Sequence, residues 1–107
     1  MAQVVKPPVQ VNEARWLTIT FEKKERLIDG DSLTSILSFV VTRGTDGVDV
    51  TSDMVEPASP SIIGKKMTFL KRYGGGANGN DYHAEALIGT ALGEKLPEVL
   101  IIEVRDE

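Results

Sequence analysis

The chain has 107 residues, 41% of them hydrophobic and 26% charged, and it contains no cysteine. This length predicts one domain, and the lack of cysteine excludes disulfides, thiolate metal sites and cysteine nucleophiles. The net charge of −4 argues against general binding to nucleic acid, which needs a basic face. No apolar run reaches the roughly 18 residues of a membrane span, so we expect neither nucleic acid nor a membrane as a partner.

The N-terminus has two interpretations. We assign residues 1–13 to a flexible arm and residues 14–107 to a β-sandwich domain. Two prolines, Pro7 and Pro8, remove backbone donors and hold the arm extended. The alternative is that the arm adds to a sheet edge through its valines, which are Val4, Val5, Val9 and Val11.

Alternating apolar and polar residues predict the first two strands. Residues 15–22 place their apolar side chains on one face, namely Leu17, Ile19 and Phe21. A turn at residues 29–31 precedes a second strand, whose core face we expect to carry Leu33, Leu37, Phe39 and Val41. The other face of this strand also carries apolar residues, Ile36 and Val40, which predicts a central position in its sheet.

The middle of the chain predicts a short strand and a hairpin. The short strand falls within residues 48–56. An irregular or edge segment follows it, because Pro57 and Pro60 cannot donate a hydrogen bond to a central strand ladder. Residues 61–63 and 66–72 then form a predicted hairpin. Its turn and core residues are Gly64, Lys65, Met67 and Phe69.

The last third of the chain predicts a loop and two strands. Four glycines make residues 73–81 the most flexible loop of the sequence. Residues 82–96 have a helix-favouring composition, but their first part alternates in polarity and Gly89 and Gly93 would weaken a helix, so we favour a strand that ends in a turn at residues 92–95. Residues 97–105 alternate clearly and predict the final strand.

Three motifs imitate ligand sites. Gly74, Gly76 and Gly79 have the G-x-G-x-x-G spacing of dinucleotide-binding loops. No βαβ repeat surrounds them, so we favour a glycine-rich connection between two strands. His83 and Glu85 match the H-x-E pair of zinc deaminases, whose chemistry also needs two cysteines. The aspartates of residues 29–31 lack the order of a calcium loop, so a turn explains them. We therefore predict no cofactor, no metal site and no catalytic residue.

A local basic cluster is the one departure from the acidic composition. Lys65, Lys66, Lys71 and Arg72 lie on or beside one predicted strand, where a solvated face is the simpler interpretation. Together with the glycine-rich loop, this strand is where we first expect a protein partner. The candidate interaction surface consists of Lys66, Lys71, Arg72, Tyr73, Asn78 and Asn80.

The position of one tyrosine resembles the tyrosine corner of immunoglobulin-like sandwiches. Tyr82 lies two residues before Ala84, which takes the place of the second cysteine of the bridge between the sheets. On the same comparison residues 30–41 resemble strand B, with Leu37 in place of the first cysteine. The resemblance implies an all-β fold, an immunoglobulin-like antiparallel sandwich of about seven strands without a disulfide.

The order of the turns is similar to that of small proteins encoded by tailed bacteriophages and prophages. The similarity covers residues 14–106 and rests on RWLTITF, G-D-S-L-x-S, D-G-V with VTS after it, S-P-S-I-x-G-K, D-Y-H-A and G-E-x-L followed by V-x-D. It implies a non-enzymatic neck, tail or capsid-associated virion protein whose partners are other phage structural proteins. Such a protein is expected in the bacterial cytoplasm, or in the virion once assembled.

A second functional class remains open, because the loops of β-sandwiches often bind ligands. The alternative is a carbohydrate- or cell-surface-binding module, against which the small number of aromatic residues counts. An enzyme is not expected, since no pair of residues offers a nucleophile with a base or an acid with a base. The sequence leaves the oligomeric state open.

Overall fold

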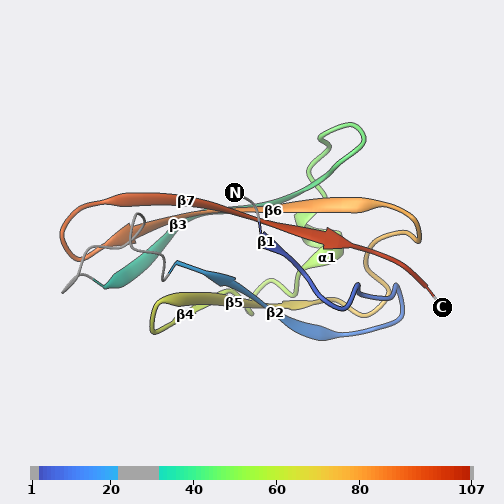
Figure 1. Ribbon diagram of the computed structural model, residues 1–107, viewed down its shortest axis with the longest axis horizontal. Coiled ribbons are helices and arrows are strands. Elements are labelled where there is room, and N and C mark those ends of the chain that lie inside the picture. Colours follow the sequence, from blue (N-terminus) through green and yellow to red (C-terminus); the bar gives the residue numbers. More distant parts are fainter. Residues whose placement is uncertain (1–2, 22–31, 107) are drawn as a thin grey trace.

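The computed structural model describes residues 3–21 and 32–106, and the expected turn at residues 29–31 lies outside them. These residues form two stacked sheets (Figure 1). The first sheet has the order β1-β7-β6-β3 and the second the order β2-β5-β4. The elements are β1 (Gln3–Val4), β2 (Arg15–Thr20), β3 (Leu33–Arg43), α1 (Thr51–Met54), β4 (Ser61–Ile63), β5 (Lys66–Lys71), β6 (Asp81–Thr90) and β7 (Lys95–Glu103).

The strand order confirms the all-β sandwich and matches the immunoglobulin topology. In an immunoglobulin domain strands C, F and G form one sheet, and strands B, E and D belong to the other. Here β3, β6 and β7 take the places of C, F and G, while β2, β5 and β4 take those of B, E and D. The first strand differs, because β1 pairs in parallel with β7.

The core forms where the inner faces of the two sheets meet. The alternation expected for β2 is confirmed, because Leu17, Ile19 and Phe21 are all buried. The β4–β5 hairpin and the strand β6 are confirmed as well, and their buried side chains are Met67, Phe69, Tyr82, Ala84, Ala86 and Ile88. One aromatic pair joins the sheets: the ring centroids of Phe39 in β3 and Phe69 in β5 lie 4.8 Å apart.

The assignment of β3 to the place of strand B is wrong. β3 pairs antiparallel with β6, so Leu37 and Ala84 belong to the same sheet and do not face each other across the core. Leu37 is 48% exposed. Its side chain lies 3.5 Å from the point that a Cβ of Gly89 would occupy. Two register shifts, after Leu33 and after Ile36, interrupt the alternation on which the expectation relied.

β3 is also an edge strand of the described sheet, and not the central strand that its sequence suggests. The interior strands are β7 and β6, and β6 pairs antiparallel with β3 on one side and β7 on the other. A central position in the sheet therefore does not explain why β3 carries apolar residues on both faces.

The strand expected within residues 48–56 is instead a crossing from one sheet to the other. Asp49 forms an isolated bridge with Thr42 in β3, and Val55 forms one with Lys71 in β5. The single helical turn α1 lies between them and buries Met54. The chain has to leave one sheet and reach the other within a few residues, which a turn allows and a straight strand does not. No helix among the described residues is long and apolar enough to cross a bilayer.

The N-terminal arm is part of the first sheet, so the boundary expected after residue 13 does not separate it from the fold. Val5 donates its N–H to Ile101 at 3.0 Å, and Val9 donates to Glu103 at 3.0 Å. Both valines are buried. The edge pairing that the valines suggested therefore describes the arm better than the flexibility inferred from its prolines.

The glycine-rich loop is held by backbone hydrogen bonds, in contrast to the flexibility expected of it. Ala77 donates its N–H to the Tyr82 hydroxyl at 2.9 Å, and Gly79 donates to Val104 at 2.8 Å. Gly76 has a φ of +89°, and a Cβ there would lie 3.0 Å from the sulfur of Met54. The buried Tyr82 thus makes the contact of a tyrosine corner, a hydroxyl bonded to the backbone a few residues upstream.

The tyrosine corner leads to a stability prediction. Tyr82→Phe keeps the buried ring but removes the acceptor of the Ala77 N–H, so we expect a loss of about 1 kcal/mol in the free energy of unfolding. Urea unfolding followed by circular dichroism measures it. The matched control is Tyr73→Phe, because Tyr73 is 70% exposed. Equal effects of the two variants would contradict the role assigned to the Tyr82 hydroxyl.

Candidate functional site

The residues of the expected interaction surface do not form one patch. Lys66 is the first residue of β5, and Arg72 follows its last residue. The two side chains are therefore separated by the length of a strand of about 20 Å. Arg72 is held by an ion pair with Glu56 at 3.4 Å and a hydrogen bond to the Ser52 carbonyl at 2.9 Å. Tyr73 follows it and is exposed. The basic strand therefore offers separate side chains and no continuous surface.

The two asparagines of the glycine-rich loop hold the C-terminal segment. The Asn78 side-chain oxygen accepts the N–H of Asp106 at 2.9 Å. The Asn80 carbonyl accepts the N–H of Val104 at 3.0 Å and a guanidinium N–H of Arg105 at 3.2 Å. These bonds give both residues a structural role, whatever else they contact.

Lys71 is fully buried and cannot belong to an interaction surface. Its ammonium donates to the carbonyls of Gln10, Val11 and Glu13 at 2.7, 2.8 and 3.1 Å. Burial lowers the pKa of this ammonium below its ordinary value, an effect that the Glu13 and Asp106 carboxylates partly offset. The side chain fixes the turn that joins the arm to β2, which sequence spacing could not indicate.

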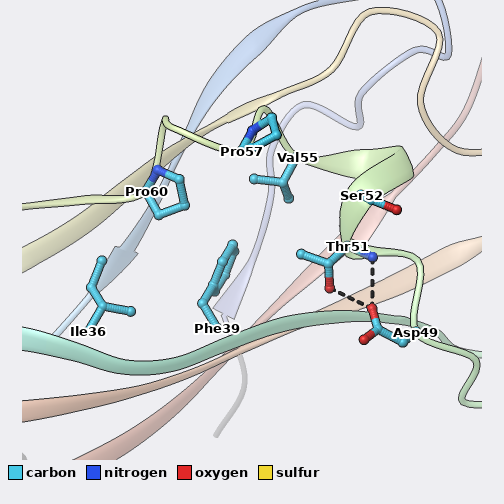
Figure 2. A pocket seen from close by; sticks show the side chains of 8 residues that line it. All are labelled: Ile36, Phe39, Asp49, Thr51, Ser52, Val55, Pro57 and Pro60. Carbon is cyan, nitrogen blue, oxygen red and sulfur yellow. Dashed lines mark hydrogen bonds between the residues drawn. The ribbon is translucent and has the colours of Figure 1, made fainter.

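A groove opens at the side of the sandwich between β3 and the crossing segment, and sequence reasoning missed it. It has a volume of about 630 Å³. Figure 2 shows the side chains of Ile36 and Phe39 pointing from β3 toward Pro60, Val55 and Pro57. The polar end is formed by Asp49, Thr51 and Ser52. The two prolines were the only sequence signal, since they marked where regular pairing stops.

Asp49 is a fixed and ionised carboxylate at the polar end of the groove. Its Oδ1 accepts the Thr51 hydroxyl at 2.7 Å and the Thr51 N–H at 2.9 Å. These hydrogen bonds lower the pKa of Asp49, and the carboxylate is exposed. Within the described residues its Oδ2 has no bonding partner, so that oxygen is free to accept.

Among the described residues, the edge of β3 is covered at one end only. Val41 accepts the N–H of Val50 at 2.8 Å and donates to the Thr51 hydroxyl at 2.8 Å, so its backbone points away from β6. In an antiparallel strand, the N–H and C=O groups of successive residues point alternately toward the paired strand and away from it. Phe39 lies two residues before Val41, so its N–H and C=O also point away from β6. Neither the N–H nor the C=O of Phe39 has a partner there among the described residues.

The outer face of the first sheet carries half-buried apolar side chains on each of its three long strands, interspersed with polar ones such as Ser38, Thr42 and His83. Val40 in β3, Glu85 in β6 and Val99 in β7 form one cross-strand row. The neighbouring rows place Leu87 and Ile101 on the same face. The sequence signal was the presence of apolar residues at consecutive positions of these strands, which we interpreted for β3 as a central position. The exposed Leu37 and the 40% exposed Val4 lie at the margins of this face.

The motifs that imitate ligand sites have structural explanations. Gly74, Gly76 and Gly79 all have positive φ, and a strand follows them where a dinucleotide site would need a helix. Their interpretation as a strand connection is confirmed. His83 and Glu85 both lie on the outer face of β6. In the part of the chain that the structure describes, no three acidic or histidine side chains group closely enough to hold a metal ion.

Comparison with known proteins adds no relative: no family model matches the chain, and neither the curated proteins nor the solved structures yield a match.

The buried lysine leads to a prediction that depends on pH. Lys71→Met keeps the aliphatic packing but leaves three carbonyls without their donor, so we expect a loss of about 2 kcal/mol at neutral pH. Because the lowered pKa means that the folded protein binds the proton more weakly than the unfolded chain, raising the pH favours wild type over the variant.

The measurement is urea unfolding of both proteins at about pH 7 and about pH 10. We expect the stability gap between them to widen with pH. Lys65→Met, at an exposed position of the β4–β5 turn, is the control and should change little at either pH. A gap that stays constant or narrows would contradict the burial of the Lys71 ammonium.

Proposed function

We propose that this chain is a non-enzymatic structural and interaction module of a bacteriophage or prophage virion. It binds other phage structural proteins and is found in the bacterial cytoplasm until it is assembled into the particle. The lineage is supported by the resemblance in the order of the turns, and the proposal assigns no catalytic step, cofactor or metal.

The outer face of the first sheet is the observation that carries the proposal. A sheet with one face in the core normally turns polar side chains to water on the other. Here the outer row through Glu85 is flanked by Val40 and Val99, with Leu87 and Ile101 beside it. Apolar side chains that gather in this way around one charged residue on the outer face of a sheet support a contact with another protein there.

A second candidate function has one observation in its favour. Trp16 is 59% exposed on the outer face of the second sheet, where it lines a shallow pocket with Ser61, Ile63 and Thr68. An exposed indole beside hydroxyl groups is a surface on which a sugar ring can stack and form hydrogen bonds. This supports the carbohydrate- or cell-surface-binding alternative.

Each function has a separate test. Genes for capsid, portal and tail proteins beside this one are expected for the virion module, and a neighbourhood without them would contradict it. For the alternative, a glycan array is probed with wild type and Trp16→Ala. Binding that disappears in the variant would establish the second function, and an array without binding would reject it.

The outer face leads to a prediction about assembly. Val99→Lys replaces an apolar side chain in the middle of the outer face by a charged one, so we expect incorporation into particles to fall at least tenfold while the fold is kept. Incorporation is measured by immunoblotting purified particles, and folding by circular dichroism. The matched control is Ile63→Lys, an exposed apolar position on the other sheet. Unchanged incorporation of Val99→Lys, or an equal loss in Ile63→Lys, would contradict the proposal.

A further inference from the structure

We propose that the groove beside β3 binds an extended peptide segment of a partner protein, apolar where it crosses Phe39 and carrying a lysine or arginine that meets Asp49. The segment adds as a short strand along the open edge of β3. This inference rests on the proposed function as an interaction module, but it concerns a different surface from the outer face of the sheet.

The backbone of β3 provides the first element of the site. The crossing segment already pairs with β3 next to Val41, where Val50 and Thr51 occupy its outward-pointing groups. The chain then turns into α1, which begins at Thr51 beside Val41. An added strand would find the N–H and C=O of Phe39, which have no partner among the described residues, as in other cases where a peptide extends a sheet.

The register shifts in β3 limit how long this strand can be. They lie between Leu33 and Ser35 and between Ile36 and Ser38, so the regular edge extends over only a few residues before Val41. Irregular edges of this kind protect a sheet from pairing with arbitrary strands. The site therefore depends on side-chain recognition in addition to backbone pairing, and its affinity is moderate.

The apolar part of the groove provides the second element. Ile36 and Phe39 are only partly buried and pack against the core from its margin. Val55, Pro57 and Pro60 face them across the opening (Figure 2). Extended chains project alternate side chains to one side, so one or two apolar side chains of a bound strand can enter this space.

The charge of the groove determines the class of peptide. Among the described residues that line it, Asp49 is the only ionisable one, and one of its oxygens has no bonding partner there. The arginines nearby are engaged with other carboxylates: Arg43 pairs with Asp46 at 3.1 Å, and Arg72 pairs with Glu56. A basic side chain in the peptide thus meets a negative charge that no described residue neutralises, and an acidic one is repelled.

The experiment selects binders from a random library of linear 12-residue peptides displayed on a carrier, using the full chain as target. We expect the recovered peptides to alternate apolar residues and to carry a lysine or arginine at one end. One recovered peptide is synthesised, and its Kd is expected on the order of 10 µM. On binding, hydrogen exchange at the Phe39 amide should slow by about tenfold or more.

Two charge-neutralising variants test the position of the peptide. Asp49→Asn should weaken binding about fivefold, in keeping with an exposed ion pair. Glu94→Gln removes the same charge from the exposed β6–β7 turn and should change the Kd less than twofold. Replacing the basic residue of the peptide by glutamate should weaken binding to wild type more than binding to Asp49→Asn.

Other outcomes overturn the inference. They are a library that yields no binder, binders without a basic residue, equal effects of Asp49→Asn and Glu94→Gln, or an unchanged Phe39 amide. Binding that is insensitive to Asp49→Asn but lost in Val99→Lys would move the peptide to the outer face. Such a result would reject the groove and leave the virion module standing, because particle incorporation is measured independently.

Discussion

The central position of β6 determines which surfaces this protein exposes. It pairs antiparallel with β3 and β7, so the inner face of these strands fills the core, and the outer face carries half-buried apolar side chains among polar ones. The same pairing leaves β3 at the edge of the described sheet. Both the outer face and the open edge follow from this one arrangement. A central β3 would have closed the edge and removed the groove.

The sandwich is completed by buried polar contacts that join segments distant in sequence. Lys71 holds the turn between the arm and β2, and the Tyr82 hydroxyl holds the glycine-rich loop. Each contact satisfies polar groups that would be costly to leave without a partner. They stabilise one end of the molecule, where the loops would otherwise be free.

The sequence was sufficient for the fold where one face of a strand is in the core and the other in water. This holds for β2, for the β4–β5 hairpin and for β6, whose alternation located their buried residues. It failed for β3, because register shifts changed the side to which Leu37 points and because apolar residues on both faces suggested a central strand. It also missed the helical turn α1, which a crossing between sheets requires.

The candidate site was less accessible to sequence reasoning than the fold. Lys71 has the composition of a surface residue, and only its contacts with carbonyls about sixty positions away explain its burial. The groove joins β3 to a segment with no motif of its own, apart from two prolines. The alternation of apolar and polar residues tells which side chains share a face of one strand. The burial of Lys71 and the groove depend instead on which segments, distant in sequence, come into contact.

Site-specific crosslinking tests the central claim, that a partner covers the outer face, most directly. A photo-crosslinking amino acid replaces Glu85, in the middle of that face, and in a second protein it replaces Ile63, on the other sheet. In cells that assemble the particle, we predict a covalent product with another virion protein from position 85 and none from position 63. A product only from position 63, or none from either, would contradict the account.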